Sequence, residues 1–205
     1  MNNPKTFIEP LGGYIVDLIY KIINKPFIPH SLTKLHNLKL CRDITGATTV
    51  VEIGTFWGVT AKRLSYLFNK VITVEIDGAL YSRALKRCRN RKNIKLIKGD
   101  GIEVLTDISP TIKNAVLFLD GHYSGGITGH GDEPEPVLKE LDIIHKHIDN
   151  FVAVVIDDFR LFGVENGWPK RSEVLEKAEK ILPCDVWPHY VLNDQFIFIR
   201  QSKKI

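Results

Sequence analysis

One segment, Thr48–Thr60, constrains the fold of this chain more than any other. Residues that favour strands lead into Glu52, and Gly54 and Gly58 follow before a stretch that is typical of a helix. A strand, a glycine-containing turn and a helix form the unit that binds nucleotide-like cofactors at the C-terminal edge of a parallel sheet. Glycine permits the sharp turn because it has no Cβ. We therefore expect an α/β fold whose cofactor site lies beside this turn.

The spacing of the glycines indicates which cofactor the turn accepts. A dinucleotide fingerprint, G-x-G-x-x-G, would need glycine at three positions, where this chain has Gly54, Phe56 and Val59. The side chain of Phe56 would keep the backbone away from a pyrophosphate, which disfavours NAD and FAD. The pattern Glu-x-Gly-x-x-x-Gly instead suits a cofactor that contains adenosine but no phosphate. S-adenosylmethionine (SAM) is the obvious candidate.

Two acidic residues near the ends of the next predicted strands are candidates for the rest of the cofactor site. Glu75, in the predicted strand Lys70–Asp77, lies 17 residues after Gly58, near the spacing at which an acid meets ribose hydroxyls. A carboxylate suits this task because it accepts hydrogen bonds from both hydroxyls. Asp100 follows the predicted strand Asn93–Lys98, where it could accept from the amino group of adenine. Asp-Gly is also an ordinary turn pair.

Three aspartates follow two predicted strands that are almost wholly apolar, as buried parallel strands are. The strand Asn114–Leu119 ends at Asp120, and the strand Phe151–Ile156 ends at Asp157 and Asp158. In neighbouring strands, unpaired carboxylates would repel one another and their pKa values would rise. A hard cation resolves this repulsion, and an all-oxygen ligand set favours Mg²⁺, with Mn²⁺ or Ca²⁺ as alternatives. The other interpretation is that the aspartates cap the following helices.

His122 is the candidate general base, two residues after Asp120. A bound metal would begin to acidify a coordinated hydroxyl, and an imidazole with a pKa near neutrality can take the proton. Alternatively, His122 only hydrogen-bonds the following loop. Tyr123 and His130 are weaker candidates. The glycine-rich segment Ser124–Gly131 is either a movable lid over the site or simply a long connection.

The two ends of the chain have different predicted organisations. Residues 1–47 form a predicted N-terminal helical extension, with helices at Tyr14–Ile23 and from Ser31 onward. These helices either pack against the sheet or cover the cofactor, the substrate or a partner subunit, such as a second copy in a homodimer. Residues 48–205 form the predicted cofactor-binding domain. Near its end, the link Asn193-Asp194 indicates an antiparallel hairpin.

Composition indicates a soluble protein with one core. The chain has 205 residues, of which 44% are hydrophobic. Its three cysteines lie far apart, show no metal-ligand spacing and fit a reducing compartment. The N-terminus does not resemble a signal peptide, and no apolar run is long enough to span a bilayer. We therefore expect a cytoplasmic protein with no membrane partner.

A basic stretch, Arg83–Lys98, raises the question of nucleic-acid binding. No aromatic residues interleave with its charges, so the sequence predicts no stacking platform. The net charge of +4 is also too small to indicate nucleic acid by itself. A solvated basic face is the favoured interpretation, and nucleic acid is a disfavoured partner.

From about residue 48 to residue 200, the chain resembles the class I SAM-dependent methyltransferases, and within them two groups of metal-dependent O-methyltransferases. The segments Glu52–Thr60 (EIGTFWGVT) and Val71–Ile76 (VITVEI) are similar to the cofactor motifs of the catechol type. The segments Leu119–Tyr123 (LDGHY) and Val155–Phe159 (VIDDF) look more like the macrocin type, which acts on deoxysugars. The resemblance implies a Rossmann-like, doubly wound seven-stranded sheet in the order 3-2-1-4-5-7-6, with the last strand antiparallel and helices on both faces.

The resemblance also implies roles for individual residues. The metal ligands would be Asp120, Asp157 and Asp158, and the catalytic residues His122 and Asp120. Thr60 would meet the cofactor carboxylate. The implied cofactor-binding residues are Glu52, Gly54, Thr55, Gly58, Thr60, Glu75, Asp100, Gly101 and Asp120. The chain departs from both groups, because no lysine follows the first metal ligand as in the catechol type, and His122 stands where the macrocin type often has an acid.

The expected function is therefore a SAM-dependent, Mg²⁺- or Mn²⁺-dependent O-methyltransferase. Its acceptor would be a hydroxyl of a glycan, a deoxysugar such as rhamnose, or another small-molecule diol. One alternative is an RNA or protein methyltransferase that uses the basic stretch. Another is a non-catalytic module that binds the cofactor without transferring its methyl group. A nucleotide-dependent oxidoreductase is the most distant alternative.

Overall fold

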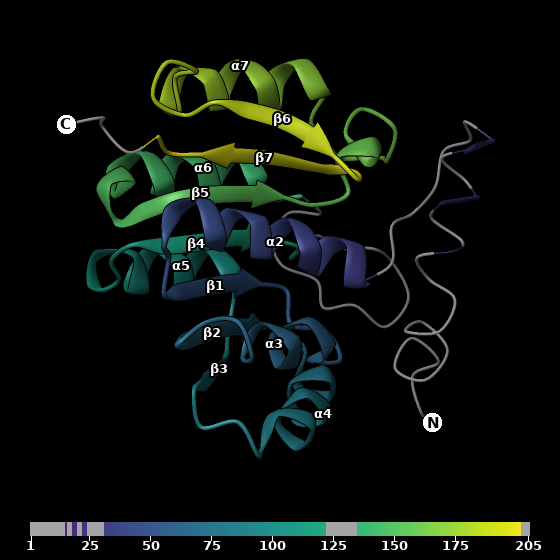
Figure 1. Cartoon of the computed structure of the whole chain (residues 1–205), viewed down its shortest axis with the longest axis vertical. Coiled ribbons are helices and arrows are strands. Elements are labelled where there is room, and N and C mark those ends of the chain that lie inside the picture. Colours follow the sequence, from purple (N-terminus) through teal and green to yellow (C-terminus); the bar gives the residue numbers. More distant parts are fainter. Residues whose placement is uncertain (1–14, 16–17, 20–21, 24–30, 122–134, 202–205) are drawn as a thin grey trace.

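A seven-stranded sheet forms the centre of the structure, with the strand order β3-β2-β1-β4-β5-β7-β6 (Figure 1). The computed structural model describes residues 31–121 and 135–201, together with positions 15, 18, 19, 22 and 23. The strands are β1 (Thr49–Ile53), β2 (Lys70–Glu75), β3 (Ile94–Lys98), β4 (Ala115–Leu119), β5 (Phe151–Ile156), β6 (His189–Leu192) and β7 (Gln195–Ile199).

The strand directions confirm the predicted topology. Strands β1 to β5 pair in parallel, whereas β7 is antiparallel to both of its neighbours, β5 and β6. The link between β6 and β7 is Asn193-Asp194, and both residues have positive φ angles, 50° and 65°. Asn and Asp tolerate this left-handed conformation, which two-residue hairpin turns require.

Helices cover both faces of the sheet, as predicted (Figure 1). Apolar side chains of α2, α3 and α4 join the core on one face, and those of α5, α6 and α7 join the core on the other. The α-helices are α2 (Ser31–Thr45), α3 (Val59–Leu64), α4 (Gly78–Cys88), α5 (Gly101–Ile108), α6 (Val137–Lys146) and α7 (Arg171–Ile181). Short 3₁₀ helices are η2 (Ser109–Thr111), η3 (Ile148–Asn150) and η4 (Phe159–Leu161).

Strand β4 shows why the chain folds around this sheet. All five of its residues are apolar, and none is more than 4% exposed. Such a strand is stable only when helices cover both of its faces. It lies between β1 and β5, so the C-terminal ends of these three strands meet at one edge of the sheet. The glycine turn and the three aspartates follow these ends.

The structure differs from the sequence-based expectations in three places. The sequence predicts a strand at Asp185–Leu192, but β6 begins at His189, because Pro188 has no N–H for the ladder and residues 183–187 form turns. The helical pattern predicts Leu85 on the same face of α4 as Leu80 and Ala84, but its side chain is 50% exposed. The described apolar side chains of the first helix, at positions 15, 18, 19, 22 and 23, are 49–73% exposed and do not pack against the sheet. Among the described residues, no helix is both long enough and apolar enough to cross a membrane.

Candidate functional site

The predicted glycine turn connects β1 to α3. Gly54 and Gly58 have φ angles of +95° and +70°, a region that favours glycine. A Cβ on Gly54 would lie 2.2 Å from the carbonyl oxygen of Asp120, at the end of β4. A Cβ on Gly58 would lie 3.1 Å from Ala84 of α4. Both glycines therefore allow the turn to pack closely against neighbouring elements.

Glu52 supports the turn from inside the protein. Its side chain is wholly buried, and its Oε2 accepts a 2.5 Å hydrogen bond from the Thr73 hydroxyl, which also contacts the Thr55 hydroxyl at 2.5 Å. Burial raises the pKa of Glu52 to about 8. The hydrogen bond from Thr73 opposes this rise, and the nearby charge of Glu75 adds to it. These contacts hold the turn in position, and the other carboxyl oxygen, Oε1, is buried without a hydrogen-bond partner. The cofactor contact expected of Glu52 stays a prediction.

Glu75 joins the turn to the end of β2. Its Oε2 accepts a hydrogen bond from the Phe56 amide at 2.7 Å, and its Oε1 accepts one from the Asp77 amide at 2.9 Å. Burial raises the pKa of Glu75, while these two amides oppose the rise. Each oxygen can accept a further hydrogen bond. The structure thus holds Glu75 rigidly beside the turn, and its ribose-binding role stays a prediction.

Asp100 caps helix α5. Its Oδ1 accepts hydrogen bonds from the Ile102 and Glu103 amides at 2.8 and 3.2 Å. This oxygen therefore has the local structural role expected of an Asp-Gly turn pair. The other carboxylate oxygen, Oδ2, is left for a ligand. A Cβ on Gly101 would lie 2.6 Å from Ile53, which explains why the helix begins with glycine. Thr60 lies half-buried in the first turn of α3. The cofactor contacts expected of these residues stay predictions.

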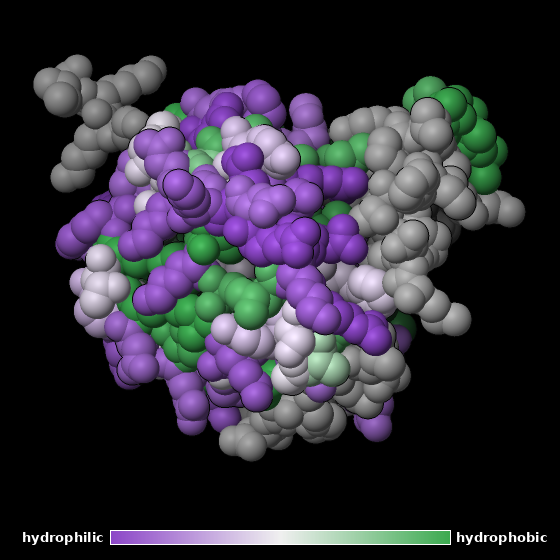
Figure 2. Space-filling view, turned by 90° about the horizontal axis from the view of Figure 1, so that it is seen from below, coloured by the Kyte–Doolittle hydropathy of each residue, from purple (hydrophilic) through white to green (hydrophobic). Residues whose placement is uncertain are grey.

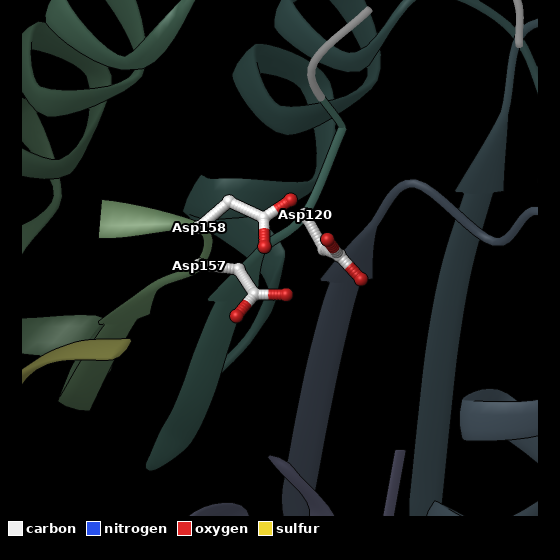
Figure 3. A group of neighbouring side chains, drawn as sticks. All are labelled: Asp120, Asp157 and Asp158. Atoms are coloured by element: carbon white, nitrogen blue, oxygen red, sulfur yellow. The ribbon is translucent and has the colours of Figure 1, made fainter. Parts of the chain in front are cut away.

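The three predicted metal ligands come together at the ends of β4 and β5 (Figure 3). These strands are parallel neighbours, and the Asp157 amide donates to the Leu119 carbonyl at 3.0 Å. One carboxylate oxygen from each of Asp120, Asp157 and Asp158 lies within 4.8 Å of the others. Asp157 is 1% exposed and Asp158 9% exposed. A buried group of three carboxylates is costly unless cations balance it.

The alternative that these aspartates cap helices is not supported for Asp157 and Asp158, and for Asp120 the following segment lies outside the described residues. Asp158 precedes η4 but makes no side-chain cap hydrogen bond, and it has a left-handed φ of 49°. Asp157 has one oxygen, Oδ1, that is buried without a hydrogen-bond partner. A buried carboxylate oxygen without a partner is expected where a ligand is missing.

Lys34 of α2 also reaches this cluster, which sequence analysis missed. Its Nζ donates to Asp157 Oδ2 and lies 3.7 Å from Asp158 Oδ1. Burial alone would lower the pKa of Lys34, but the charges of the three aspartates outweigh it and raise the pKa. Burial is also the main cause that raises the pKa of Asp120; Asp157 and Asp158 add to it, while Lys34 opposes it.

Arg160 provides the second cation of the cluster. Its Nη1 donates to Asp158 Oδ1 at 2.7 Å and also binds the Asp194 carboxylate. The backbone amide of Arg160 donates to Asp194 Oδ1 at 2.7 Å. The β6–β7 turn therefore holds Arg160, which in turn orients Asp158. Among the described residues, Lys34 and Arg160 are thus the cations that contact these carboxylates.

His122, the expected base, lies outside the described residues, as do Tyr123, His130 and the glycine-rich segment. Its role therefore stays a prediction that rests on its position two residues after Asp120.

Solved structures with a similar fold are complexes with SAH or SAM. An O-methyltransferase from Bacillus cereus in complex with SAH has a TM-score of 0.60 at 15% identity and covers 96% of each chain. The O-methyltransferase TomG from Streptomyces achromogenes in complex with SAM has a TM-score of 0.59 at 14% identity, and the match covers 98% of this chain and 97% of TomG. The chain has the class I methyltransferase fold. At these identities the likeness shows the fold of the chain and not its substrate.

Other proteins with this class I methyltransferase fold act on RNA. A Methanococcus jannaschii fibrillarin, a pre-rRNA processing protein, has a TM-score of 0.50 at 16% identity over 78% of this chain and 69% of its own. The family model for ribosomal RNA adenine dimethylase matches residues 24–115, less than half of the chain. Ribosomal RNA small subunit methyltransferase A of Pelotomaculum thermopropionicum is 29% identical over 99 residues, or 48% of this chain. The match spans 30% of that enzyme's length.

Proposed function

We propose that the protein is a SAM-dependent, divalent-metal-dependent O-methyltransferase. The acceptor is a hydroxyl of a glycan, a deoxysugar such as rhamnose, or another small-molecule diol. The observation that carries this proposal is the group of Asp120, Asp157 and Asp158, which lies at the same edge of the sheet as the glycine turn. The class I fold supports SAM as the cofactor.

The residues of the cluster fit a divalent metal ion. All candidate ligand atoms are carboxylate oxygens, which Mg²⁺ and Mn²⁺ prefer, and the unpartnered Oδ1 of Asp157 is available to bind one. A divalent cation would also relieve the mutual repulsion of the three carboxylates. When bound, the ion lowers the pKa of a coordinated hydroxyl and stabilises the resulting negative charge.

Residues of the chain bind the cofactor, orient the metal ligands and accept the proton of the acceptor. Gly54 and Gly58 let the turn approach the cofactor, and Glu75 accepts from its ribose hydroxyls. Arg160 orients Asp158, and Lys34 holds Asp157. His122 takes the proton of the acceptor hydroxyl. A vicinal diol is the favoured acceptor because two adjacent oxygens fix the orientation of the reacting one.

RNA is the second candidate acceptor, favoured by the match to ribosomal RNA adenine dimethylase. That match ends at Ala115, the first residue of β4, so it covers the cofactor half of the sheet but not the aspartate cluster. The shared segment therefore supports SAM binding in both candidate functions. The acidic site beyond it favours oxygen as the methylated atom.

A panel experiment tests the proposed function. The protein is incubated with isotopically labelled SAM, Mg²⁺ and separate pools of sugars, glycosides, catechols and ribosomal RNA, and the products are read by mass spectrometry. We expect label in a hydroxyl-bearing small molecule, and no loss of that product when RNA is added as a competitor. Label in RNA alone would replace the leading proposal with the second one. SAM binding without transfer to any pool would support a non-catalytic module.

A further inference from the structure

A groove lined by cations lies between α3 and α4, away from the aspartate cluster. It has a volume of about 550 Å³. We call it the α3–α4 groove; its lining includes Trp57, Lys62, Arg83, Lys86, Arg87 and Arg89. Figure 2 looks at the molecule from the side of α4 and β3, and hydrophilic side chains cover much of this face. We propose that the α3–α4 groove binds single-stranded nucleic acid.

The charge of this region is unbalanced. The stretch Arg83–Lys98 contains eight lysines and arginines and no acidic residue. The whole chain has a net charge of +4, so all residues outside this stretch together carry a net charge of −4. Positive charge is therefore concentrated on one side of the molecule. Such segregation attracts a polyanion to that side.

The charges of the groove are not neutralised by acidic side chains of the described residues. Across residues 31–121 and 135–201, none of the five lysines and arginines of the groove forms an ion pair. Cations elsewhere on the surface do pair, as Lys177 does with Asp142 and Arg200 with Asp149. Five like charges around one hollow repel one another. A chain of phosphates would relieve this repulsion.

Two of the arginines are fixed against Trp57 at the wall of the groove. The guanidinium of Arg83 lies 4.9 Å from the centre of the Trp57 ring, and Arg87 Nε donates to the Trp57 carbonyl at 2.8 Å. A guanidinium held in one plane loses little conformational entropy when it binds phosphate. The groove is therefore preorganised and not merely charged.

A second aromatic ring lies next to α3. Tyr66 is 66% exposed, and the guanidinium of Arg91 lies 3.9 Å from its ring centre. Ser65 holds Arg91 in place by accepting two hydrogen bonds, at 2.7 and 2.6 Å. No aromatic residue lies within the basic stretch itself, as the sequence shows, but two rings from outside it contact its arginines. The aromatic residues come from positions 57 and 66, and the fold brings them to the arginines.

These features favour nucleic acid over other polyanions. Single-stranded nucleic acids bind to positively charged grooves whose aromatic and guanidinium planes stack on the bases. An acidic peptide or a polysaccharide sulfate would use the charges but not the flat surfaces. Because charge and stacking do not distinguish ribose from deoxyribose, we expect RNA and DNA strands to bind with similar affinity.

Fluorescence anisotropy with labelled 12-nucleotide RNA and DNA strands tests the proposal. The full chain is titrated without SAM and without metal, so the result does not depend on the proposed reaction. The test variant is Arg83→Gln/Lys86→Gln/Arg89→Gln, in which all three replaced side chains are exposed. The control Lys113→Gln/Lys146→Gln/Lys180→Gln removes the same charge from exposed positions elsewhere. Thermal melts confirm that both variants fold.

We expect the groove variant to bind at least tenfold more weakly than wild type, and the control to stay within threefold of it. The slope of log K against log salt should fall by about 2, since each lost phosphate contact contributes roughly 0.7 for single strands. Tyr66→Leu should weaken binding of the strands but not of polyphosphate. The absence of binding by wild type, or equal affinity in the groove and control variants, would overturn the proposal. The proposal would also be overturned if polyphosphate bound as tightly as the strands and Tyr66→Leu had no effect on strand binding.

Discussion

Lys34 and Asp157 lie 123 residues apart in the sequence and form a buried ion pair at the end of β5. The pair ties α2 to the centre of the candidate metal site. The Asp157 side chain is fully buried and that of Lys34 is 15% exposed. In the protein without metal, Lys34 therefore neutralises part of the negative charge of the aspartates, and a divalent ion would neutralise more of it.

Replacement of this lysine should destabilise the metal-free protein. Lys34→Met leaves Asp157 without its cation, and loss of one partner of a buried pair costs roughly 3–5 kcal/mol. Added Mn²⁺ should restore most of the lost stability, because an ion that binds only the folded state stabilises it. Differential scanning calorimetry with chelator or with Mn²⁺ measures both effects. The control is Lys39→Met, which removes an exposed ion pair with Asp43 on the same helix. Equal melting temperatures of Lys34→Met and wild type in chelator would contradict this role.

Removal of the Glu75 carboxylate should weaken cofactor binding. Glu75→Ala leaves the ribose hydroxyls unpaired, which costs roughly 1–3 kcal/mol. Isothermal titration with SAM measures the change, and Glu103→Ala, an exposed acid on α5, is the matched control. Tight binding of NAD by the wild-type protein, with no binding of SAM, would refute the cofactor assignment.

Glu52 should make the stability of the protein depend on pH. Its pKa is about 8 in the folded state and near the ordinary 4.5 in the unfolded state, so the folded state binds more protons between these values. Folding stability then falls as pH rises from about 5 to 8, by up to roughly 1.4 kcal/mol for each pH unit. Glu52→Gln cannot ionise and should lose this contribution. Urea unfolding at pH 5, 6.5 and 8 tests it; parallel stability profiles for the variant and wild type would show that Glu52 does not titrate in this range.

His122 should affect turnover and not cofactor binding. If it takes the proton of the acceptor, His122→Ala should lower kcat by about 10²–10⁴-fold while the SAM affinity changes little. Steady-state kinetics and SAM titration of the same preparation separate the two quantities. His145→Ala, an exposed histidine on α6, controls for histidine loss in general. A variant without His122 that keeps the wild-type kcat would leave the activation of the hydroxyl to the metal.

Much of the fold could be predicted because its signals are local. The apolar strands, the glycine turn and the hairpin at Asn193-Asp194 each follow from short-range patterns, and the resemblance supplied the strand order. The three aspartates could be placed together because parallel neighbouring strands end at one edge. Helix α5 was not predicted, although Asp100 and Glu103 form a recognisable helix start.

Lys34 and the two aromatic residues that contact the arginines of the basic stretch could not be predicted from local patterns. Their partners are distant in sequence, so only tertiary packing brings them together. One signal for Lys34 exists, since it shares a helical face with the buried residues Leu38 and Cys41. A lysine on an apolar helix face indicates a buried anion. For Trp57 and Tyr66, no comparable signal connects them with Arg83 and Arg91.

A calorimetric titration with Mn²⁺ tests the central claim most directly. We expect wild type to bind one Mn²⁺ per chain, with or without SAM. Asp157→Asn should abolish this binding while it keeps the SAM affinity, and the matched control Asp142→Asn, an exposed aspartate on α6, should bind Mn²⁺ as wild type does. Failure of wild type to bind Mn²⁺, or binding by Asp157→Asn that is as tight as wild type, would contradict the assignment of the aspartate cluster as the metal site.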